Sequence, residues 1–441
     1  MPVKRILDAS LSSVDPERAV IDHFRRDGSS LIINGTRLPL DAFERIFLIG
    51  AGKAGEPMAR AIQEILGDRL TIGVVVVKDG YAKNTTLTPQ ISIITAAHPV
   101  PDHRGIQAAK KILKLLQDTT HRDLVIFLFS GGGSALLTSP PPGISLPDLQ
   151  NLTEILLRCG ATINEINVLR KHLDEVKGGQ LARRAAPARV ITLILSDVIG
   201  DPLDIIASGP TVPDPSTFQD ALSILERYSI VPQVPAAILD HLRRGIEGDL
   251  SDTPKPGDPN FERVTNLVIA SNMTAAQAAV QQAQHEGFHA RLLTCFLQGE
   301  ARQAGRFLAA VLKQMATDGQ PLPRPACLVA GGETTVTLKG EGLGGRNQEL
   351  ALAAVDDLIG LQGALLAALA TDGGDGPTDA AGAVVSGKTR DRARELGLAP
   401  EDYLARNDSY HFFERLDDLI ITGPTQTNVN DLIFLFTFPL D

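Results

Sequence analysis

Short apolar runs rich in β-branched residues alternate with longer stretches of helical periodicity along the chain. This alternation is typical of sheets whose parallel strands are joined by crossover helices. In the first half the runs are continuously apolar, as expected for strands that are covered on both faces. We expect these strands at 45–49, 72–77, 91–95, 124–129 and 190–195. The pattern therefore predicts an α/β protein whose first domain is a Rossmann-like, three-layer fold around a parallel sheet.

A turn-rich segment divides the chain. Residues 245–259 (GIEGDLSDTPKPGDP) collect Gly, Asp, Ser and Pro, which bury little apolar surface and favour turns. We therefore predict domains at 1–245 and 260–441. In the second domain, strands are expected at 267–270, 292–296, 327–330, 365–370 and 419–422, with antiparallel additions at 336–338 and 433–436. Because two connections are too short for a helical crossover, this smaller α/β domain should contain a mixed sheet.

Composition excludes several classes of protein. The chain has 441 residues, of which 43% are apolar and 21% charged, and its net charge of −10 gives no attraction to nucleic acid. Three widely separated cysteines argue against a zinc knot or a disulfide framework. No apolar stretch approaches the length of a membrane span. We expect a cytoplasmic protein with small-molecule ligands and neither nucleic-acid nor membrane partners, and whether two copies form a homodimer stays open.

Two glycine-rich loops directly follow predicted strands. The loop at 50–55 (GAGKAG) matches the dinucleotide glycine pattern, in which Gly52 would let the backbone approach a phosphate. Lys53 adds a cation, which suits a phosphoryl group. The second loop consists of Ser130, Gly131, Gly132, Gly133 and Ser134, whose successive N–H groups can form an anion-binding concavity. Both loops are therefore candidate anion sites, and the alternative for each is an ordinary tight turn.

Acidic residues after predicted strands are candidates for metal binding or proton transfer. Asp197 follows the strand at 190–195, where it could hold a divalent cation or accept a proton. Asp372 and Asp375 follow the strand at 365–370 on a glycine-rich loop. Hard oxygen ligands suit magnesium that is carried by nucleotide phosphates, so we predict a metal site there. A solvated acidic turn is the alternative.

The second domain also holds candidate binding residues. Gly331, Gly332 and Glu333 follow a predicted strand, and Arg346 lies at the amino end of a predicted helix. A cation at that end opposes the helix dipole unless an anion is bound between them, so its position indicates a ligand. Asn272 is a further binding candidate, although it can also belong to a simple helix cap.

Structural roles explain several other polar residues. We expect His98 to be structural, and Asp102 and Glu349 to cap helices. The cationic side chains of the helix at 167–172 (NVLRKH) are expected mainly in solvent, with a cleft as the alternative.

Together these segments resemble the class II glycerate 2-kinases over nearly the whole chain. The resemblance is carried by GAGKAG (50–55), HPVPD (98–102), SGGGSALL (130–137), NVLRKHLDEVKGGQLA (167–182), SDVIGDP (196–202), SGPTVPDPSTF (208–218), GGETTVTLKGEGLGGRNQELAL (331–352), ATDGGDGPTDAAGA (370–383) and GPTQTNVNDL (423–432).

The resemblance implies a second domain of the MOFRL type and a phosphotransferase with an alcohol group as acceptor. Such an enzyme uses ATP and Mg²⁺ to phosphorylate the 2-hydroxyl of D-glycerate, which gives 2-phosphoglycerate and ADP. The lysine and arginine implicated in the family's activity fall on Lys53 and Arg346. We add Asp197 as a third catalytic candidate, and expect the ligands to bind in a cleft between the domains.

Two other functions stay open. Taken literally, the glycine fingerprint at 50–55 predicts an NAD(P)H-dependent hydroxypyruvate reductase, with Asp79 at the ribose hydroxyls. A reductase of this kind would give no clear role to the acidic residues and Arg346 of the second domain. A noncatalytic nucleotide or sugar-phosphate sensor would bind ATP without turnover.

Overall fold

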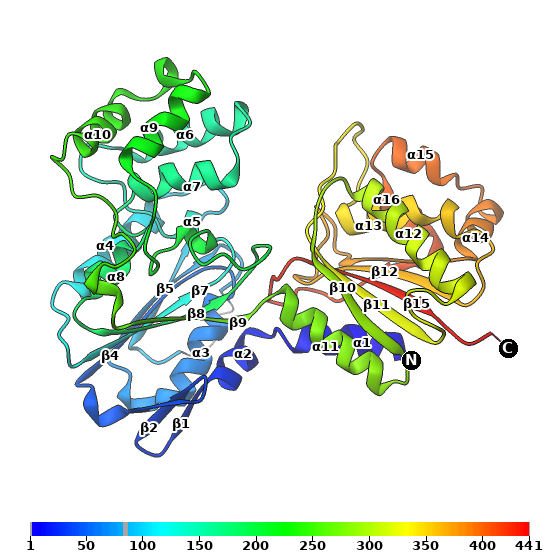
Figure 1. Ribbon diagram of the computed structural model, residues 1–441, viewed down its shortest axis with the longest axis horizontal. Coiled ribbons are helices and arrows are strands. Elements are labelled where there is room, and N and C mark those ends of the chain that lie inside the picture. The colour runs from blue at the N-terminus through cyan, green and yellow to red at the C-terminus, as the bar shows by residue number, and fades with distance from the viewer. Residues whose placement is uncertain (1, 83–86, 441) are drawn as a thin grey trace. The chain divides into compact units, whose positions relative to one another are not determined.

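The computed structural model describes residues 2–82 and 87–440, which form two compact units (Figure 1). The N-terminal unit consists of Pro16–Ser196 and Asp201–Ile269, and the C-terminal unit contains the remaining described residues. The predicted domains were 1–245 and 260–441, but the start of the chain belongs to the C-terminal unit. The reason is that helix α1 (Pro2–Ser12) packs on helix α11 (Asn272–His285) with Ile6 fully buried. Small side chains allow this approach, since the buried residues of α11 are mostly alanines.

A six-stranded sheet forms the centre of the N-terminal unit, in the order β6-β5-β4-β7-β8-β9. Its strands are β4 (Arg45–Ala51), β5 (Ile72–Lys78), β6 (Ile91–Ala96), β7 (Asp123–Phe129), β8 (Arg189–Leu195) and β9 (Val264–Ala270). The five strands β4 to β8 pair in parallel, and all five were predicted. The expectation that 267–270 begins the second sheet is wrong, because β9 lies beside β8. Chain order reverses between β4 and β7, so the loops after these two strands meet.

Helices cover both faces of this sheet, as the three-layer prediction requires. Helix α3 (Gly55–Leu66) packs on one face together with α2 (Pro16–His23), and α4 (His103–Leu116) contacts α8 (Gln180–Ala185) on the other (Figure 1). A small antiparallel sheet of β1 (Phe24–Asp27), β2 (Ser30–Ile33) and β3 (Thr36–Pro39) contacts α3. The periodicity argument did not predict this small sheet, whose outer strands are mostly exposed.

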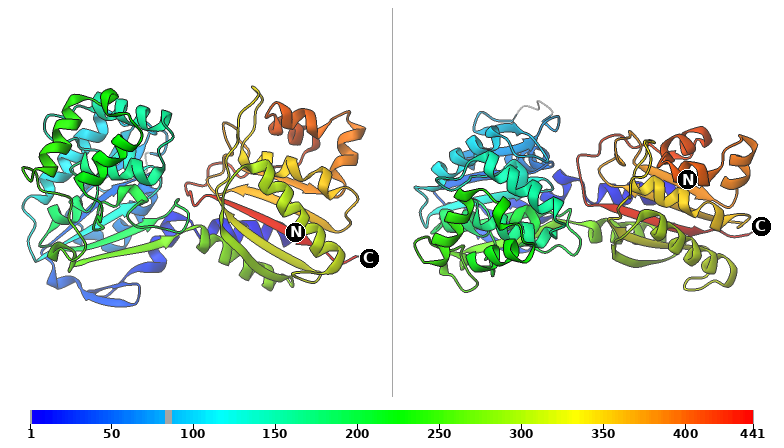
Figure 2. Two further views of the ribbon diagram at one scale, coloured as in Figure 1. Left: turned by 45° about the horizontal axis from the view of Figure 1, so that its top comes forward. Right: turned by 90° about the horizontal axis from the view of Figure 1, so that it is seen from above.

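A helical cap with its own hydrophobic core belongs to the same unit. It consists of α6 (Leu146–Arg158), α7 (Ile163–His172), α9 (Phe218–Arg227) and α10 (Ala236–Ile246). These helices gather on one side of the unit in Figure 1 and in the left view of Figure 2. Leu152, Leu169 and Phe218 are among the buried residues of its core. Residues 201–246, where the sequence pattern is weak, therefore build a helical layer rather than further strands.

The C-terminal unit has a mixed sheet, as predicted, in the order β10-β11-β15-β12-β13-β14. Its strands are β10 (His289–Leu297), β11 (Ala326–Gly332), β12 (Ala364–Ala370), β13 (Gly382–Ser386), β14 (Leu419–Ile420) and β15 (Asp431–Thr437). Only β10 and β11 pair in parallel, and β15 runs antiparallel between β11 and β12. The start of β15 therefore lies beside the ends of β11 and β12.

The strand predicted at 336–338 is wrong, because a side chain takes the place of a partner strand there. Glu300 accepts hydrogen bonds from the backbone N–H of Thr337 at 3.1 Å and from its hydroxyl at 2.9 Å.

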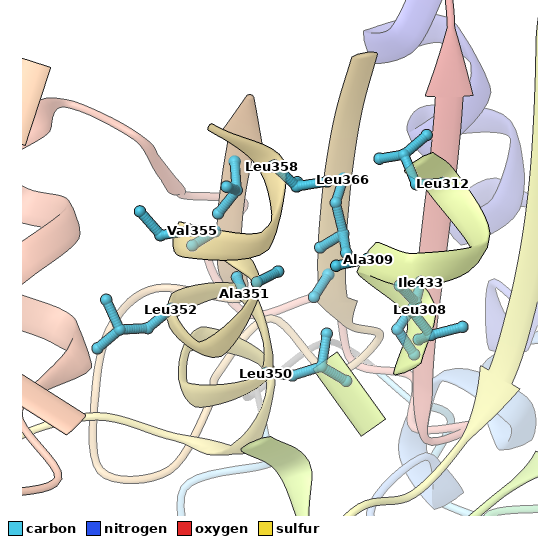
Figure 3. Close-up of a cluster of buried hydrophobic side chains, with 14 of the residues drawn as sticks. Leu308, Ala309, Leu312, Leu350, Ala351, Leu352, Val355, Leu358, Leu366 and Ile433 are labelled. Atoms are coloured by element: carbon cyan, nitrogen blue, oxygen red, sulfur yellow. The ribbon is translucent and has the colours of Figure 1, made fainter. Parts of the chain in front are cut away.

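The core of this unit lies between the sheet and helices α12 (Ala301–Asp318) and α13 (Arg346–Ala354). Figure 3 shows Leu308 and Leu312 of α12, Leu350 of α13, Leu366 of β12 and Ile433 of β15 gathered in this cluster. The two helices lie so close that a Cβ on Gly305 would be 2.1 Å from the Leu350 carbonyl oxygen. This contact fixes α13, and with it the residues at its amino end.

The other described helices of this unit are α14 (Thr389–Glu395), α15 (Pro400–Ala405) and α16 (Ser409–Leu416). None of the helices in residues 2–82 and 87–440 combines the length and apolar character needed to cross a bilayer.

We expect Leu366→Ala to lower the free energy of unfolding by about 2–5 kcal/mol, because it leaves a cavity in this core. Leu366 is fully buried, whereas Leu338 is 76% exposed, so Leu338→Ala serves as the control and should stay within about 0.5 kcal/mol. Denaturant unfolding of both variants measures the difference. Equal effects would contradict the packing described for the cluster.

Candidate functional site

The loops after β4 and β7 are joined by a close backbone contact. Gly52 has φ +141°, and a Cβ there would lie 2.1 Å from the Ser130 hydroxyl oxygen. The same hydroxyl oxygen accepts a hydrogen bond from the backbone N–H of Ala54 at 3.0 Å, and the N–H of Lys53 donates to the Gly131 carbonyl at 2.9 Å. Only glycine fits this approach. The two loops predicted separately therefore form one site.

Unsatisfied donors give this site the character of an anion-binding concavity. Within the described part of the N-terminal unit, the backbone N–H groups of Gly131, Gly132 and Ser134 donate no hydrogen bond to the protein. The ammonium group of half-buried Lys53 likewise has no ion-pair partner among the described residues of this unit. Gly132, with φ +85°, turns the chain into the short helix α5 (Gly133–Leu136). Such clustered donors match an anion such as a phosphate.

His98 and Lys78 extend this site. A Cβ on Gly132 would be 3.0 Å from the His98 ring, so the imidazole lies directly against the glycine loop. Burial, together with the positive charges of Lys53 and Lys78, lowers the pKa of His98 to about 4. His98 is therefore neutral at neutral pH. Lys78 was not among the predicted site residues, and His98 was expected to be structural, although the motif at 98–102 was a signal for it.

A chain of hydroxyl groups reaches the second glycine loop. The hydroxyl oxygens of Ser134 and Ser208 are 2.8 Å apart, and Ser208 donates to the side-chain carbonyl of Asn167 at 3.0 Å. Ala207 and Ser208 both have positive φ, of 50° and 62°, which is strained for residues with a Cβ. Because the Ser208 proton goes to Asn167, Ser134 must donate to Ser208. These contacts hold Ser134 in one orientation.

The expectation that the cationic side chains of 167–172 lie mainly in solvent is wrong. Lys171 is buried and forms ion pairs with Asp204 at 3.3 Å and Asp214 at 3.4 Å. His172 is also buried, 3.0 Å from an oxygen of Asp252. The ion pairs of Lys171 compensate the cost of burying its charge. Their acidic partners lie 33 to 80 residues away in the sequence, so the helix pattern alone could not reveal them.

The C-terminal unit presents Arg346 at the first position of α13. Its Nε and Nη2 donate to Asp431 at 2.6 and 3.0 Å, and its Nη1 donates to Glu333 at 2.8 Å. The anion predicted at this helix end is therefore supplied at least in part by the protein itself. A guanidinium group carries five N–H donors, of which these contacts use three. The remaining two can bind a ligand.

Asp375 caps the same helix. Its two carboxylate oxygens accept the backbone N–H groups of Asn347 at 3.1 Å and Gln348 at 2.8 Å. Burial and the neighbouring charge of Asp431 raise the pKa of Asp375 to about 6, despite the hydrogen bonds that oppose the shift. Burial likewise raises the pKa of Asp431. These acids anchor Arg346 and the start of α13.

The predicted magnesium ligands fit only in part. In residues 2–82 and 87–440, no group of three or more His, Cys, Asp and Glu is arranged to hold a metal ion. Asp375 fits poorly, because both of its oxygens bond to the helix end. Asp372 is half-buried, and one of its oxygens accepts the Gly374 N–H at 3.2 Å. Asp372 can therefore serve as a single carboxylate ligand for a Mg²⁺ whose other ligands are phosphate and water.

Asn272 and the glycines at 331 and 332 hold the strand ends together. Asn272 donates to the carbonyl groups of Val429 at 2.8 Å and Asp431 at 2.9 Å, which goes beyond a simple helix cap. A Cβ on Gly331 would lie 1.9 Å from the Asn272 amide oxygen, and one on Gly332 would lie 2.1 Å from the Leu297 carbonyl. The close packing of the protein itself therefore requires both glycines.

The other predicted residues divide between the units. Asp197, half-buried after β8, groups with the C-terminal unit. Asp102 caps α4, as expected, by accepting the N–H groups of Arg104 and Gly105. Glu349 does not act as a cap: it accepts hydrogen bonds from Arg302 at 2.6 and 2.8 Å.

Asp79 is held by Arg104 through two hydrogen bonds, at 2.8 and 2.7 Å. The carboxylate that a dinucleotide site would need for its ribose is therefore engaged by the protein.

Comparison with known proteins shows the family of this chain. The family model described as "Domain of unknown function (DUF4147)" matches residues 2–243, and the model of the MOFRL family matches residues 326–431. A glycerate 2-kinase from Pyrococcus horikoshii is 43% identical over 430 residues, which cover 97% of this chain and 95% of the relative. The chain belongs to the class II glycerate kinase family.

Two further comparisons concern a solved structure with the same fold and a relative that carries a different functional name. The crystal structure of a glycerate kinase from Thermotoga maritima superimposes with a TM-score of 0.89 at 42% identity, covering 99% of this chain and 98% of that structure. A protein from Agrobacterium vitis named as a putative hydroxypyruvate reductase is 41% identical over 433 residues, covering 98% of this chain and 92% of the relative.

We expect Gly52→Ala to disrupt the contact between the two loops, because its Cβ would collide with Ser130 and its φ is unfavourable for alanine. The free energy of unfolding should fall by about 2–4 kcal/mol. Gly319 also has positive φ, but it lies in the left-handed helical region (φ 66°, ψ 23°) with the nearest atom 3.5 Å from its Cβ position, so Gly319→Ala should cost only about 1 kcal/mol. Denaturant unfolding compares the two. Equal losses would contradict a close approach at Gly52.

The raised pKa of Asp375 predicts a specific pH dependence of stability. Between pH 3.8 and about 6 the folded protein keeps a proton that the unfolded chain has released, so this contribution is lost as the pH rises through about 6. From about pH 4 to pH 7, the free energy of unfolding of wild type should fall by about 2 kcal/mol relative to that of Asp375→Asn, which has no carboxyl group to ionise. Denaturant unfolding at each pH measures this difference. The exposed Asp391→Asn is the control. If the free energies of unfolding of wild type and Asp375→Asn changed with pH in the same way, the raised pKa of Asp375 would be refuted.

Proposed function

We propose that this protein is a glycerate 2-kinase, which transfers the γ-phosphoryl group of ATP to the 2-hydroxyl of D-glycerate and gives 2-phosphoglycerate and ADP. Membership of the class II glycerate kinase family supports this proposal. The observation that carries it is the cluster of unsatisfied N–H donors at the second glycine loop beside Lys53. Phosphoryl transfer needs fixed positive charge and positioned donors, and the site offers both.

The reaction defines what each group would do. The 2-hydroxyl oxygen attacks the γ-phosphorus, the bond from that phosphorus to the bridging oxygen breaks, and the hydroxyl proton passes to a base. Lys53 and the N–H groups after β7 neutralise the charge of the phosphates. Arg346, with two donors left, suits the substrate carboxylate or the migrating group. Asp197 is the candidate base.

Magnesium enters this proposal as the partner of ATP. When bound, it neutralises phosphate charge, and Asp372 is the side chain that suits it. Asp375 is left out of the metal site, because the helix end engages both of its oxygens.

A hydroxypyruvate reductase is the second candidate, since it fits the glycine fingerprint and the name of the Agrobacterium vitis relative. The ion pair of Asp79 with Arg104 argues against it. Loss of NADH absorbance with hydroxypyruvate as substrate would support the reductase. A coupled assay with ATP, Mg²⁺ and D-glycerate, followed by identification of the phosphorylated carbon, tests the kinase. Phosphate on the terminal carbon would contradict a 2-kinase.

We expect Lys53→Ala to lower kcat by about 100-fold or more, because a fixed cation at the phosphates is lost. Its melting temperature should stay near that of wild type, since the ammonium group has no ion-pair partner in the described part of its unit. Lys313→Ala, on the exposed face of α12, is the matched control and should keep full activity. Lys53 gives a cleaner test than Arg346, because removing Arg346 would leave Asp431 buried without its partner. Near-normal turnover of Lys53→Ala would contradict the proposed role of Lys53 at the phosphates.

A further inference from the structure

A cavity of about 560 Å³ lies within the N-terminal unit, lined by residues 99–101 after β6 and by parts of α5, α6 and α7. Its lining is mainly apolar, with Val100, Leu149, Leu152 and Leu157 among the residues that face it. The volume lies in the range of small-molecule sites. A three-carbon hydroxy acid is too small and too polar to fill it, so the cavity suits a larger ligand with an apolar body.

One positive charge in this cavity is compensated only in part, by the attraction of Asp174. Arg170 lines it and is half-buried, yet its guanidinium group makes no hydrogen bond or ion pair within the described part of the unit. Asp174, the nearby acid, is already engaged by Lys177 and by the backbone N–H groups of Ser139 and Val176. A half-buried charge without a partner is unfavourable, so the cavity favours an anionic ligand.

The other acid of the lining, Glu154, does not compensate Arg170, because it pairs with Arg158 on the exposed side of α6.

Ser134 adds a polar contact of known direction. Its hydroxyl proton goes to Ser208, whose own proton goes to Asn167. Ser134 is a residue of the cavity lining, and its hydroxyl oxygen is left as an acceptor that fits a hydroxyl or amino group of a ligand. Ser134 also belongs to the glycine loop, so a ligand in the cavity can extend to the free N–H groups there.

We propose that this cavity binds the nucleoside of ATP, with Arg170 at the phosphates and Ser134 accepting from a nucleoside hydroxyl or amino group, so that the N-terminal unit holds the nucleotide. A nucleoside triphosphate has the apolar base, the donor groups and the negative charge that the three observations require. This inference rests on the proposed kinase activity for the identity of its ligand.

Blocking the cavity tests the proposal. Val100 and Leu157 line it and are 57% and 64% exposed, so a larger side chain at either position should not disturb the core. We expect Val100→Trp and Leu157→Trp each to raise the KM for ATP by about tenfold or more, and to leave the KM for D-glycerate within about twofold. Leu338→Trp, on an exposed residue of the C-terminal unit, is the control. A rise in the glycerate KM alone, or no change in either constant, would overturn the proposal.

Direct binding separates this proposal from the proposed function. Calorimetric titration of wild type with ATP, without glycerate, should show binding that Val100→Trp weakens by about tenfold. Arg170→Gln should weaken the binding of ATP but not of adenosine, which lacks the phosphates. If wild type binds ATP in this way but phosphorylates no glycerate, the function fails and the site stands. If wild type is a glycerate kinase and the variants bind ATP normally, the site fails and the function stands. Absence of ATP binding in wild type would overturn both.

Discussion

The contact between Gly52 and Ser130 is the constraint on which the N-terminal site depends. The order of the chain through the sheet reverses between the neighbouring parallel strands β4 and β7, so the loops that follow these strands converge. Because Gly52 has no side chain, the two backbones can touch. The contact places the Lys53 N–H on the Gly131 carbonyl, which fixes where the next N–H groups point. Free donors at a strand end are costly in a folded protein unless water or a ligand satisfies them. Their presence is the physical argument for an anion site.

The C-terminal unit solves a different electrostatic problem. It places Arg346 at the amino end of α13, where the helix dipole disfavours a cation. Asp431 and Glu333 compensate that charge, and Asp375 satisfies the N–H groups of the helix end. Because Asp431 is buried, removing Arg346 would leave its carboxylate buried without a partner, so the pair must be kept together. The packing of α13 against α12 keeps this arrangement rigid.

Much of the fold could be predicted from the sequence, because a buried parallel strand is a continuous apolar run. Strands β4 to β8 followed from that rule alone. The small sheet β1 to β3 did not, since its outer strands are exposed and lack the pattern. Strand β9 was assigned to the wrong sheet, because an apolar run shows that a strand is buried but not beside which strand it lies. The same limit explains the attachment of α1 to the C-terminal unit.

The glycine loops could be found because close backbone approach leaves a local signature, namely glycine after an apolar run. The partners of charged side chains could not, since they lie far along the chain. Asp431 is 85 residues from Arg346, and Asp214 is 43 residues from Lys171. The resemblance to a known family implies a role in activity for Lys53 and Arg346, but it gave no information on what surrounds them. Lys78 at the end of β5 carried no pattern and was missed for that reason.

A crystal structure of the full chain with D-glycerate and a non-hydrolysable ATP analogue would show where the phosphates bind. We expect phosphate oxygens within hydrogen-bond distance of the Gly131, Gly132 and Ser134 N–H groups, with the Lys53 ammonium group beside them. Phosphates bound elsewhere, with these three N–H groups facing water alone, would contradict this expectation.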